Sequence, residues 1–227
     1  MEGIELPDYL FPSPCTISVA GPSGSAKSSI CMEILRYRQT LFSQPVAGVL
    51  YCYSEWQPMF RNPPGGDVHF HQGLPTIEEL DKYLDTFKQR HFLLFLDDLM
   101  SEVSQSQLMQ DIFTKISHHR NFSCINILQN LFTQGKAARS QSLNSHFYIL
   151  TRTCRDIKQI ALLGSQLFPG KTKEFVKVYQ DAVDHLLNDK IAPFLLVSCH
   201  PLQTKRSCQL LANVLPPDAA RVLYRLD

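Results

Sequence analysis

The sequence predicts an α/β fold in which a mostly parallel sheet is flanked by helices on both faces. Short apolar runs typical of buried strands recur along the chain, and segments with helical periodicity lie between most of them. The chain has 227 residues, 44 % of them hydrophobic, which is enough for one large core. The expected strands are Thr16–Ala20, Val46–Tyr53, Val68–Phe70, Phe92–Leu96, Cys124–Leu128, Phe147–Leu150 and Phe194–Ser198.

Helices are expected between these strands. Thr76 and Glu79 have the spacing of a capping box, in which each side chain bonds the backbone N–H of the other residue. A second helix is expected at about Gln105–Ser117, a third after a capping Asp156, and a fourth at about Lys173–Leu187. The helix after Thr76 should place four apolar residues on one face: Ile77, Leu80, Leu84 and Phe87.

Composition predicts an intracellular protein. We expect a short extension, residues 1–14, before a single domain, residues 15–227. No apolar run approaches the roughly 18–20 residues of a membrane span, so no membrane contact is expected. The first 14 residues contain acids and prolines, unlike a secretory signal. The seven cysteines form no C-x-x-C pair, which favours a reducing compartment.

The segment Gly21–Ser28 reads G-P-S-G-S-A-K-S and directly follows the first strand, as a phosphate-binding P-loop does before its helix. Glycines let successive N–H groups point into one concavity that attracts anions. Lys27 then reaches the terminal phosphates, and the Ser28 hydroxyl coordinates Mg²⁺ at the start of the helix. The expected nucleotide-binding residues are Gly21, Pro22, Ser23, Gly24, Ser25, Ala26, Lys27, Ser28 and Ser29.

Ala26 stands where the usual motif has glycine. Alanine removes some backbone freedom but adds only a methyl group. The replicative helicases of the minichromosome-maintenance family also carry A-K-S here, so alanine is compatible with nucleotide binding. The alternative interpretations are an ordinary Gly/Ser turn before a helix, or a P-loop that has lost its activity.

A second motif is the buried run Phe92–Leu96 followed by two acids, which is typical of a Walker B strand. Asp97 is the expected Mg²⁺ ligand, and Asp98 is placed to orient or deprotonate the attacking water. Glu55, at the end of an earlier strand, is the alternative for that second role. The stretch between Lys27 and Asp97 leaves room for further strands, as in the additional-strand P-loop NTPases. The alternative is a strand end capped by two solvated acids.

A third signal is Gln129, which ends the strand after the Walker B strand. A polar side chain at that position can touch the γ-phosphate and report its loss to neighbouring elements. By itself this signal is weak, because Gln and Asn commonly end strands. The three motifs in this order are more specific.

Taken together, these motifs resemble the genome-packaging ATPases of double-stranded DNA viruses and related mobile elements, in the FtsK–HerA branch of P-loop motors. The similarity spans roughly Cys15 to Tyr179, and the segment Ser117–Asn144 carries most of its specificity. It implies an ATPase that uses ATP and Mg²⁺, forms a homo-oligomeric ring and drives double-stranded DNA into a capsid, with capsid protein as a partner. It also implies a location in the infected host cell or in the virion.

The resemblance further implies an arginine finger, supplied in trans by a neighbouring subunit, which offsets charge on the transferred phosphoryl group. Arg139 is the first candidate because it follows the Gln129 strand on a polar loop; Arg155 and Arg152 are rivals. Lys136 is expected to contact DNA phosphates. A net charge of only +1 means that any DNA contact must come from a local patch, a ring or a partner.

Two other classes stay open at this point. One is a different additional-strand ATPase, such as a helicase or helicase loader. The other is a non-motor nucleotide-binding module or a small-molecule kinase. A kinase usually needs a lid with several arginines, and the sequence has no such cluster. A self-contained helicase normally needs a longer chain.

Overall fold

A computed structural model describes residues 9–87, 90–99, 121–132, 144–184, 191–201 and 209–226. The helix expected at about Gln105–Ser117 lies outside these ranges, and so do Lys136 and Arg139. Within the described ranges, every strand and every other helix expected from the sequence is present.

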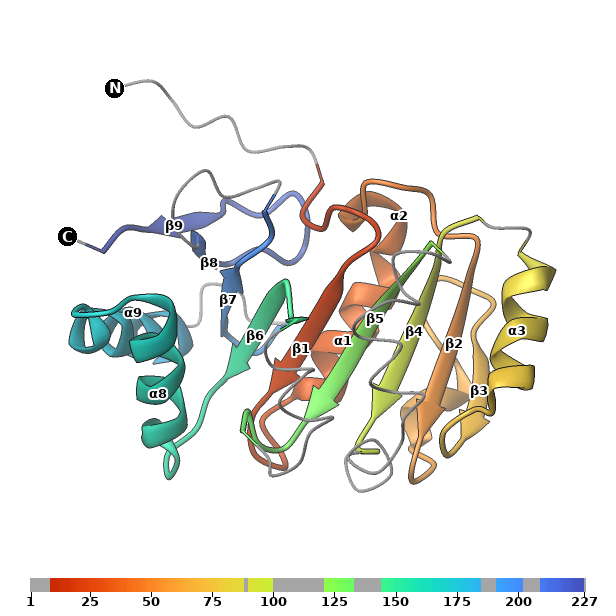
Figure 1. Ribbon diagram of the computed structural model, residues 1–227, viewed down its shortest axis with the longest axis horizontal. Helices are drawn as coiled ribbons and strands as arrows, with labels where there is room; N and C mark the ends of the chain where they lie inside the picture. Colours follow the sequence, from red (N-terminus) through yellow and green to blue (C-terminus); the bar gives the residue numbers. More distant parts are fainter. Residues whose placement is uncertain are drawn as a thin grey trace.

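The strands of the described chain form one sheet in the order β3-β2-β4-β5-β1-β6-β7-β8-β9 (Figure 1). All pairs from β3 to β6 are parallel, and the pairs from β6 to β9 are antiparallel. The expectation of a mostly parallel α/β sheet is confirmed. The strands are β1 Thr16–Ala20, β2 Gly48–Tyr53, β3 His69–Gln72, β4 Phe92–Asp97, β5 Phe122–Leu128, β6 Phe147–Thr151, β7 Phe194–Ser198, β8 Gln209–Ala212 and β9 Val222–Tyr224.

Strand β5 lies between β1 and β4 and pairs with both along its length. Strand β5 therefore separates the P-loop strand from the Walker B strand, although it follows both in sequence; the strands for which the stretch between Lys27 and Asp97 left room are β2 and β3. Because these strands are parallel, their carboxyl ends meet at one edge of the sheet, which is where ligands bind in open α/β folds. The P-loop, the Walker B acids and Gln129 all follow strands that end at this edge. Strands β8 and β9 were not predicted, because both are short.

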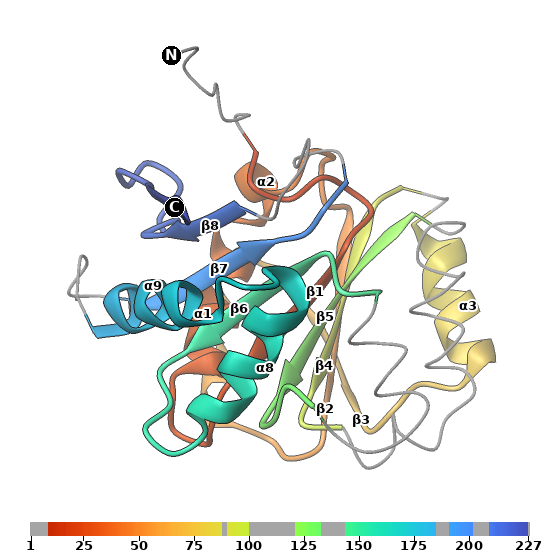
Figure 2. The ribbon, with the colours of Figure 1, turned by 60° about the vertical axis from the view of Figure 1, so that its left-hand side comes forward.

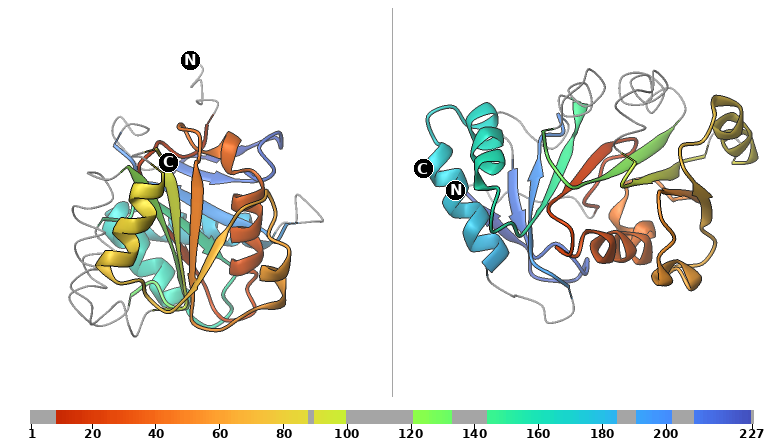
Figure 3. Two further views of the ribbon diagram at one scale, coloured as in Figure 1. Left: turned by 90° about the vertical axis from the view of Figure 1, so that its right-hand side faces the viewer. Right: turned by 90° about the horizontal axis from the view of Figure 1, so that it is seen from below.

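Helices cover both faces of the sheet, as expected. On one face, α1 (Lys27–Arg36), α2 (Arg38–Leu41) and the 3₁₀ helix η1 (Pro58–Arg61) pack on alternate residues of the strands. On the other, α8 (Ile157–Leu167) and α9 (Thr172–Asp184) cover β6 and β7, while α3 (Ile77–Thr86) covers β2 and β4. Figures 2 and 3 show α1 and the α8–α9 pair on opposite sides of the sheet.

Helix α3 begins with the predicted capping box. The Glu79 N–H donates to the Thr76 hydroxyl at 3.2 Å, and the Thr76 N–H donates to the Glu79 carboxylate at 2.8 Å. Leu80 is buried on the sheet, whereas Ile77, which was expected on the same apolar face, is 55 % exposed. Ile77 is in the first turn, outside the apolar cluster on which the helix packs.

The residues before β1 join the main core. Phe11 is buried and packs against Phe42 and Phe147, with ring centroids 5.2 and 5.0 Å apart. A domain boundary between residues 14 and 15 stays a prediction. Among the helices that the structure describes, none combines the length and the apolar character that crossing a membrane requires.

Candidate functional site

The P-loop connects β1 to α1, and its shape depends on two left-handed backbone conformations. Gly24 has φ +78° and Ala26 has φ 66°. Gly21 is required by a close approach, because a Cβ atom there would lie 1.9 Å from the Thr151 hydroxyl oxygen. Helix α1 begins at Lys27, one residue earlier than expected, and Ala26 is its N-cap residue.

The conformation of Ala26 corrects the sequence interpretation of this position. The added methyl group is small, but a left-handed conformation costs an L-residue with a Cβ atom about 1–2 kcal/mol. Glycine would adopt it without that cost. The departure from the usual motif therefore leaves the shape of the loop intact and makes it less stable.

Lys27 holds the start of the loop. Its ammonium group donates to the carbonyl oxygens of Gly21 at 2.7 Å and of Pro22 at 2.8 Å. Burial lowers the pKa of Lys27, and the nearby carboxylates of Asp97 and Asp98 oppose this effect. The cation therefore lies between the first residues of the P-loop and the two Walker B acids.

Asp97 ends β4 and is nearly buried, with 5 % of its surface exposed. The Tyr51 hydroxyl, from the adjacent strand β2, donates to its carboxylate at 2.8 Å. Burial raises the pKa of Asp97, the bond from Tyr51 lowers it, and the charge of Asp98 raises it further. The Tyr51 hydroxyl thus holds one of the two carboxylate oxygens of Asp97 and does not bond the other.

Asp98 and Gln129 are joined at the carboxyl ends of β4 and β5. The Gln129 amide nitrogen lies 3.0 and 2.8 Å from the two carboxylate oxygens of Asp98 and donates to them. Asp98 has φ 56°, which turns the chain away from the β4 direction immediately after Asp97. The two neighbouring acids therefore have separate partners, Tyr51 for Asp97 and Gln129 for Asp98.

The three motifs line one cavity of about 490 Å³, which we call the phosphate cavity. Its wall includes Lys27, Ser28, Asp97, Asp98 and Gln129. Oxygen donors such as a serine hydroxyl and a carboxylate suit Mg²⁺, which normally takes one or two carboxylates together with waters and phosphates. Within the described ranges no group of three or more His, Cys, Asp or Glu residues is arranged for a metal ion.

Two residues of the phosphate cavity, Gln57 and Met59, were missed by sequence reasoning. They belong to the Pro-rich loop after β2, and the adjacent Trp56 packs edge-on against Tyr53 at a centroid distance of 5.4 Å. Glu55, the alternative water-polarising acid, is exposed and does not line this cavity. Of the two candidate acids, the geometry favours Asp98.

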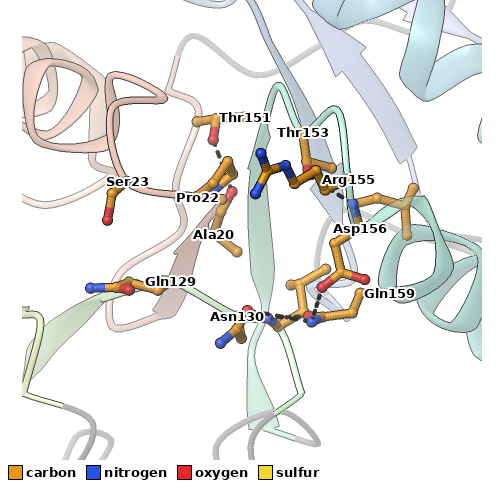
Figure 4. Close-up of a pocket in the computed structure, with 13 residues that line it drawn as sticks. Ala20, Pro22, Ser23, Gln129, Asn130, Thr151, Thr153, Arg155, Asp156 and Gln159 are labelled. Carbon is orange, nitrogen blue, oxygen red and sulfur yellow. Dashed lines mark hydrogen bonds between the residues drawn. The ribbon is translucent and has the colours of Figure 1, made fainter.

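A second cavity, of about 280 Å³, adjoins the first, and Ser23 and Gln129 line both. We call it the β6–α8 cavity, because its far wall comes from the segment between β6 and α8 (Figure 4). Thr151 ties this wall to the P-loop: its hydroxyl is 3.1 Å from the Ala20 carbonyl oxygen and 2.7 Å from the Ser25 hydroxyl. No sequence motif indicated this cavity.

The structure separates the three arginines considered for the finger. Arg155 lines the β6–α8 cavity. Arg152 lines neither cavity and is paired with Asp184 at 3.3 Å on the surface of α9. Arg139, the first candidate, is outside the described residues, so its role stays a prediction.

Comparison with solved structures finds the same fold in a viral protein. The chain resembles the genome packaging NTPase B204 from Sulfolobus turreted icosahedral virus 2, solved in complex with sulfate, at a TM-score of 0.52 and 9 % identity, over 87 % of this chain and 95 % of that one. The same protein in complex with AMP gives a TM-score of 0.50 and 11 % identity, over 84 % and 95 % of the two chains. B204 from Sulfolobus turreted icosahedral virus, described as the DNA-packaging ATPase, gives 0.50 and 11 %, over 94 % and 98 %.

The chain has the fold of the viral genome-packaging NTPases. This likeness confirms the fold class and the resemblance that the motifs predicted. At 9–11 % identity it is a likeness of fold. Comparison of the sequence with models of protein families gives no match, and comparison with curated proteins gives none either.

Proposed function

We propose that this protein is an Mg²⁺-dependent ATPase that moves double-stranded DNA during the packaging of a viral genome. One observation carries the proposal: a P-loop, two Walker B acids and a strand-end glutamine line a single cavity, in a fold shared with viral packaging NTPases. The likeness to proteins solved with sulfate or AMP supports a nucleotide as the ligand.

Lys27 and the P-loop amides bind the terminal phosphates in this proposal. To reach them, the ammonium group exchanges its two carbonyl contacts with Gly21 and Pro22 for phosphate oxygens. Gly24 and Ala26 keep the left-handed conformations that turn the loop around the anion. Lys27 supplies the charge, and the loop supplies hydrogen bonds of fixed direction.

Asp97 and Ser28 would hold the Mg²⁺, which neutralises charge that develops on the phosphates. The hydrogen bond from Tyr51 orients the Asp97 carboxylate toward the cavity. Asp98 accepts a proton from the attacking water or orients it, and Gln129 positions the Asp98 carboxylate. Gln129 is also placed to respond when the terminal phosphate leaves.

Translocation requires more than one subunit in this proposal. A homo-oligomeric ring would enclose the duplex, with Lys136 and its neighbours on the DNA phosphates, and capsid protein would be the docking partner. The near-neutral charge of the chain favours a ring, because each subunit then needs to supply only a few phosphate contacts.

The decisive experiment measures the ATPase rate of size-fractionated protein with and without duplex DNA. We expect DNA to raise the rate of the oligomeric fraction, and binding to weaken steeply as salt rises from about 50 to 200 mM. Unwinding of a forked duplex would favour a helicase, and phosphate transfer to a small metabolite would favour a kinase. If duplex DNA leaves the hydrolysis rate unchanged in every fraction, the proposed function as a DNA motor is wrong.

The trans-acting finger has its own test. An Arg139→Ala protein should bind ATP normally and turn over slowly. Mixed with an Asp98→Asn protein it should regain activity, because some interfaces then join an intact cavity to an intact finger. Full activity of dilute monomer, or no recovery in mixed assemblies isolated through two different tags, would exclude this role for Arg139.

A further inference from the structure

The β6–α8 cavity opens at the terminal-phosphate end of the P-loop. Lys27, the group that reaches the β- and γ-phosphates, is bonded to the carbonyl oxygens of Gly21 and Pro22. Gly21, Pro22 and Ser23 line the β6–α8 cavity, whereas Gly24 and the residues Ala26–Ser28 line only the phosphate cavity. A nucleotide held by this loop therefore has its last phosphate next to the boundary between the two cavities.

Gln129 also lies at the boundary between the two cavities. It lines both cavities, and its amide is bonded to Asp98, the acid proposed to act on the attacking water. The attacking water must be in line with the bond to the γ-phosphate. Ser23 and Gln129, the two residues shared by the cavities, thus flank the place where that phosphate reacts.

Arg155 is the single cation among the described residues that line the β6–α8 cavity. It follows β6 and precedes α8, and its side chain extends toward Pro22 (Figure 4). Among the described residues no carboxylate forms an ion pair with it. The carboxylate of the neighbouring Asp156 accepts a hydrogen bond from the Gln159 amide. Arg152, three residues earlier, is held by Asp184.

The wall that carries Arg155 is fixed to the P-loop of the same chain. The Thr151 hydroxyl bonds Ala20 and Ser25, and the Tyr179 hydroxyl accepts from the Thr153 N–H at 2.9 Å and donates to the Thr151 carbonyl at 2.9 Å. Tyr179 is buried on α9. Both ends of Thr151–Thr153 are therefore tied to the subunit's own core, just before the arginine.

Building on the proposed function, we propose that Arg155 binds the terminal phosphate of the nucleotide held by its own subunit. The β6–α8 cavity is then a cis-acting phosphate subsite, and Arg155 is not the arginine that acts on a neighbouring subunit. A guanidinium contacts phosphate through charge-assisted bonds, so its removal weakens binding of a triphosphate and not of a diphosphate.

The test compares affinities for AMPPCP and ADP, in the presence of Mg²⁺, on protein diluted until it runs as a monomer. Arg155→Ala should reduce the preference for AMPPCP over ADP about tenfold or more, with ADP affinity unchanged. Arg155→Lys should retain part of the preference. Arg152→Ala, which removes an arginine already paired with Asp184, is the matched control and should leave the ratio unchanged.

A mixing experiment separates action in cis from action in trans. If Arg155 serves its own cavity, mixing Arg155→Ala with Asp98→Asn creates no intact site in any arrangement, so mixed assemblies isolated through two tags should be no more active at subsaturating ATP than Arg155→Ala alone. A rate of the mixed assemblies above that of Arg155→Ala alone would overturn the inference, and so would an unchanged binding ratio in monomeric Arg155→Ala. If the wild-type protein bound neither nucleotide, the proposed function would fail as well; unchanged ratios with normal binding overturn this inference alone.

Discussion

The two walls around the P-loop are built in different ways. Most of the wall of the phosphate cavity comes from short motifs at strand ends, and the residues within each motif are a few positions apart in sequence. The wall of the β6–α8 cavity comes from Thr151 and the segment after it, and Thr151 bonds Ala20 across a separation of 131 residues. The P-loop is a continuous motif in the sequence, but its structure is supported on one side by β6, a strand far along the chain.

The difference reflects two roles: some residues contact the reacting groups, and others hold the P-loop in place. Residues that touch phosphate or metal need particular side chains, so they leave recognisable patterns. Thr151 bonds one backbone carbonyl and one hydroxyl, and many sequences could provide such a residue on β6. Substitution of the motif residues that touch phosphate or water should therefore slow the reaction strongly, whereas loss of a supporting residue such as Thr151 should weaken nucleotide binding by a smaller amount.

The largest effect is expected from Lys27→Ala. It removes the charge that binds the β- and γ-phosphates, so ATP turnover should fall by about 100-fold or more. Phosphate release measured at saturating Mg·ATP tests this. Lys177→Ala, an exposed lysine on α9, is the control and should retain full activity. Unchanged hydrolysis by the Lys27 variant would show that the P-loop assignment is wrong.

The two Walker B acids should differ in the step that they affect. Asp98→Asn should bind Mg·ATP but hydrolyse it about 100-fold more slowly, because it removes the group that activates water. Asp97→Asn should weaken binding that depends on Mg²⁺ about tenfold, since it removes a metal ligand. Calorimetry with and without Mg²⁺, combined with single-turnover rates, separates the two. Full kcat in Asp98→Asn would return Glu55 to consideration.

The β6 side is tested by Thr151→Val. This change keeps the shape of the side chain and removes the hydroxyl that bonds Ala20 and Ser25, so nucleotide affinity should fall about fivefold. Thr151→Ser retains the hydroxyl and is the matched control. The same loss in both variants would mean that packing of the threonine, and not its hydrogen bonds, supports the loop.

The smallest effect is expected from Ala26→Gly. Glycine relieves the left-handed strain of about 1–2 kcal/mol, but it loses more backbone entropy on folding, so the net gain should be about 0.5 kcal/mol. Urea unfolding at constant m-value measures it. Ala161→Gly, inside α8, should instead lose about 1 kcal/mol. A loss of stability in both would contradict the conformation assigned to Ala26.

Much of the phosphate cavity was predictable because local chemistry determines it. The P-loop residues, the two acids and Gln129 follow apolar strands, and parallel strands bring their carboxyl ends together. Tyr51 was missed because it lies inside an apolar run and looks like core. A signal did exist: a buried tyrosine hydroxyl needs a partner, and the Walker B carboxylate at the end of the adjacent strand could supply it.

The rest of the fold was less accessible for a different reason. Ile77 fits the helical period, yet the period gives only the direction of an apolar face and not how far the sheet extends beneath it. Strands β8 and β9 have four and three residues, too few to show a period. The β6–α8 cavity depends on which strands are neighbours, and this information belongs to the topology and not to any one segment.

Trp56 gives this protein an internal optical signal. It is the single tryptophan of the sequence, about half of its surface is exposed, and its indole contacts Phe60 and Phe70 edge-on. The next residue, Gln57, lines the phosphate cavity. Indole emission depends on the polarity around the ring, so the filling of that cavity should change the intrinsic fluorescence. Nucleotide occupancy could then be followed in real time on unlabelled protein.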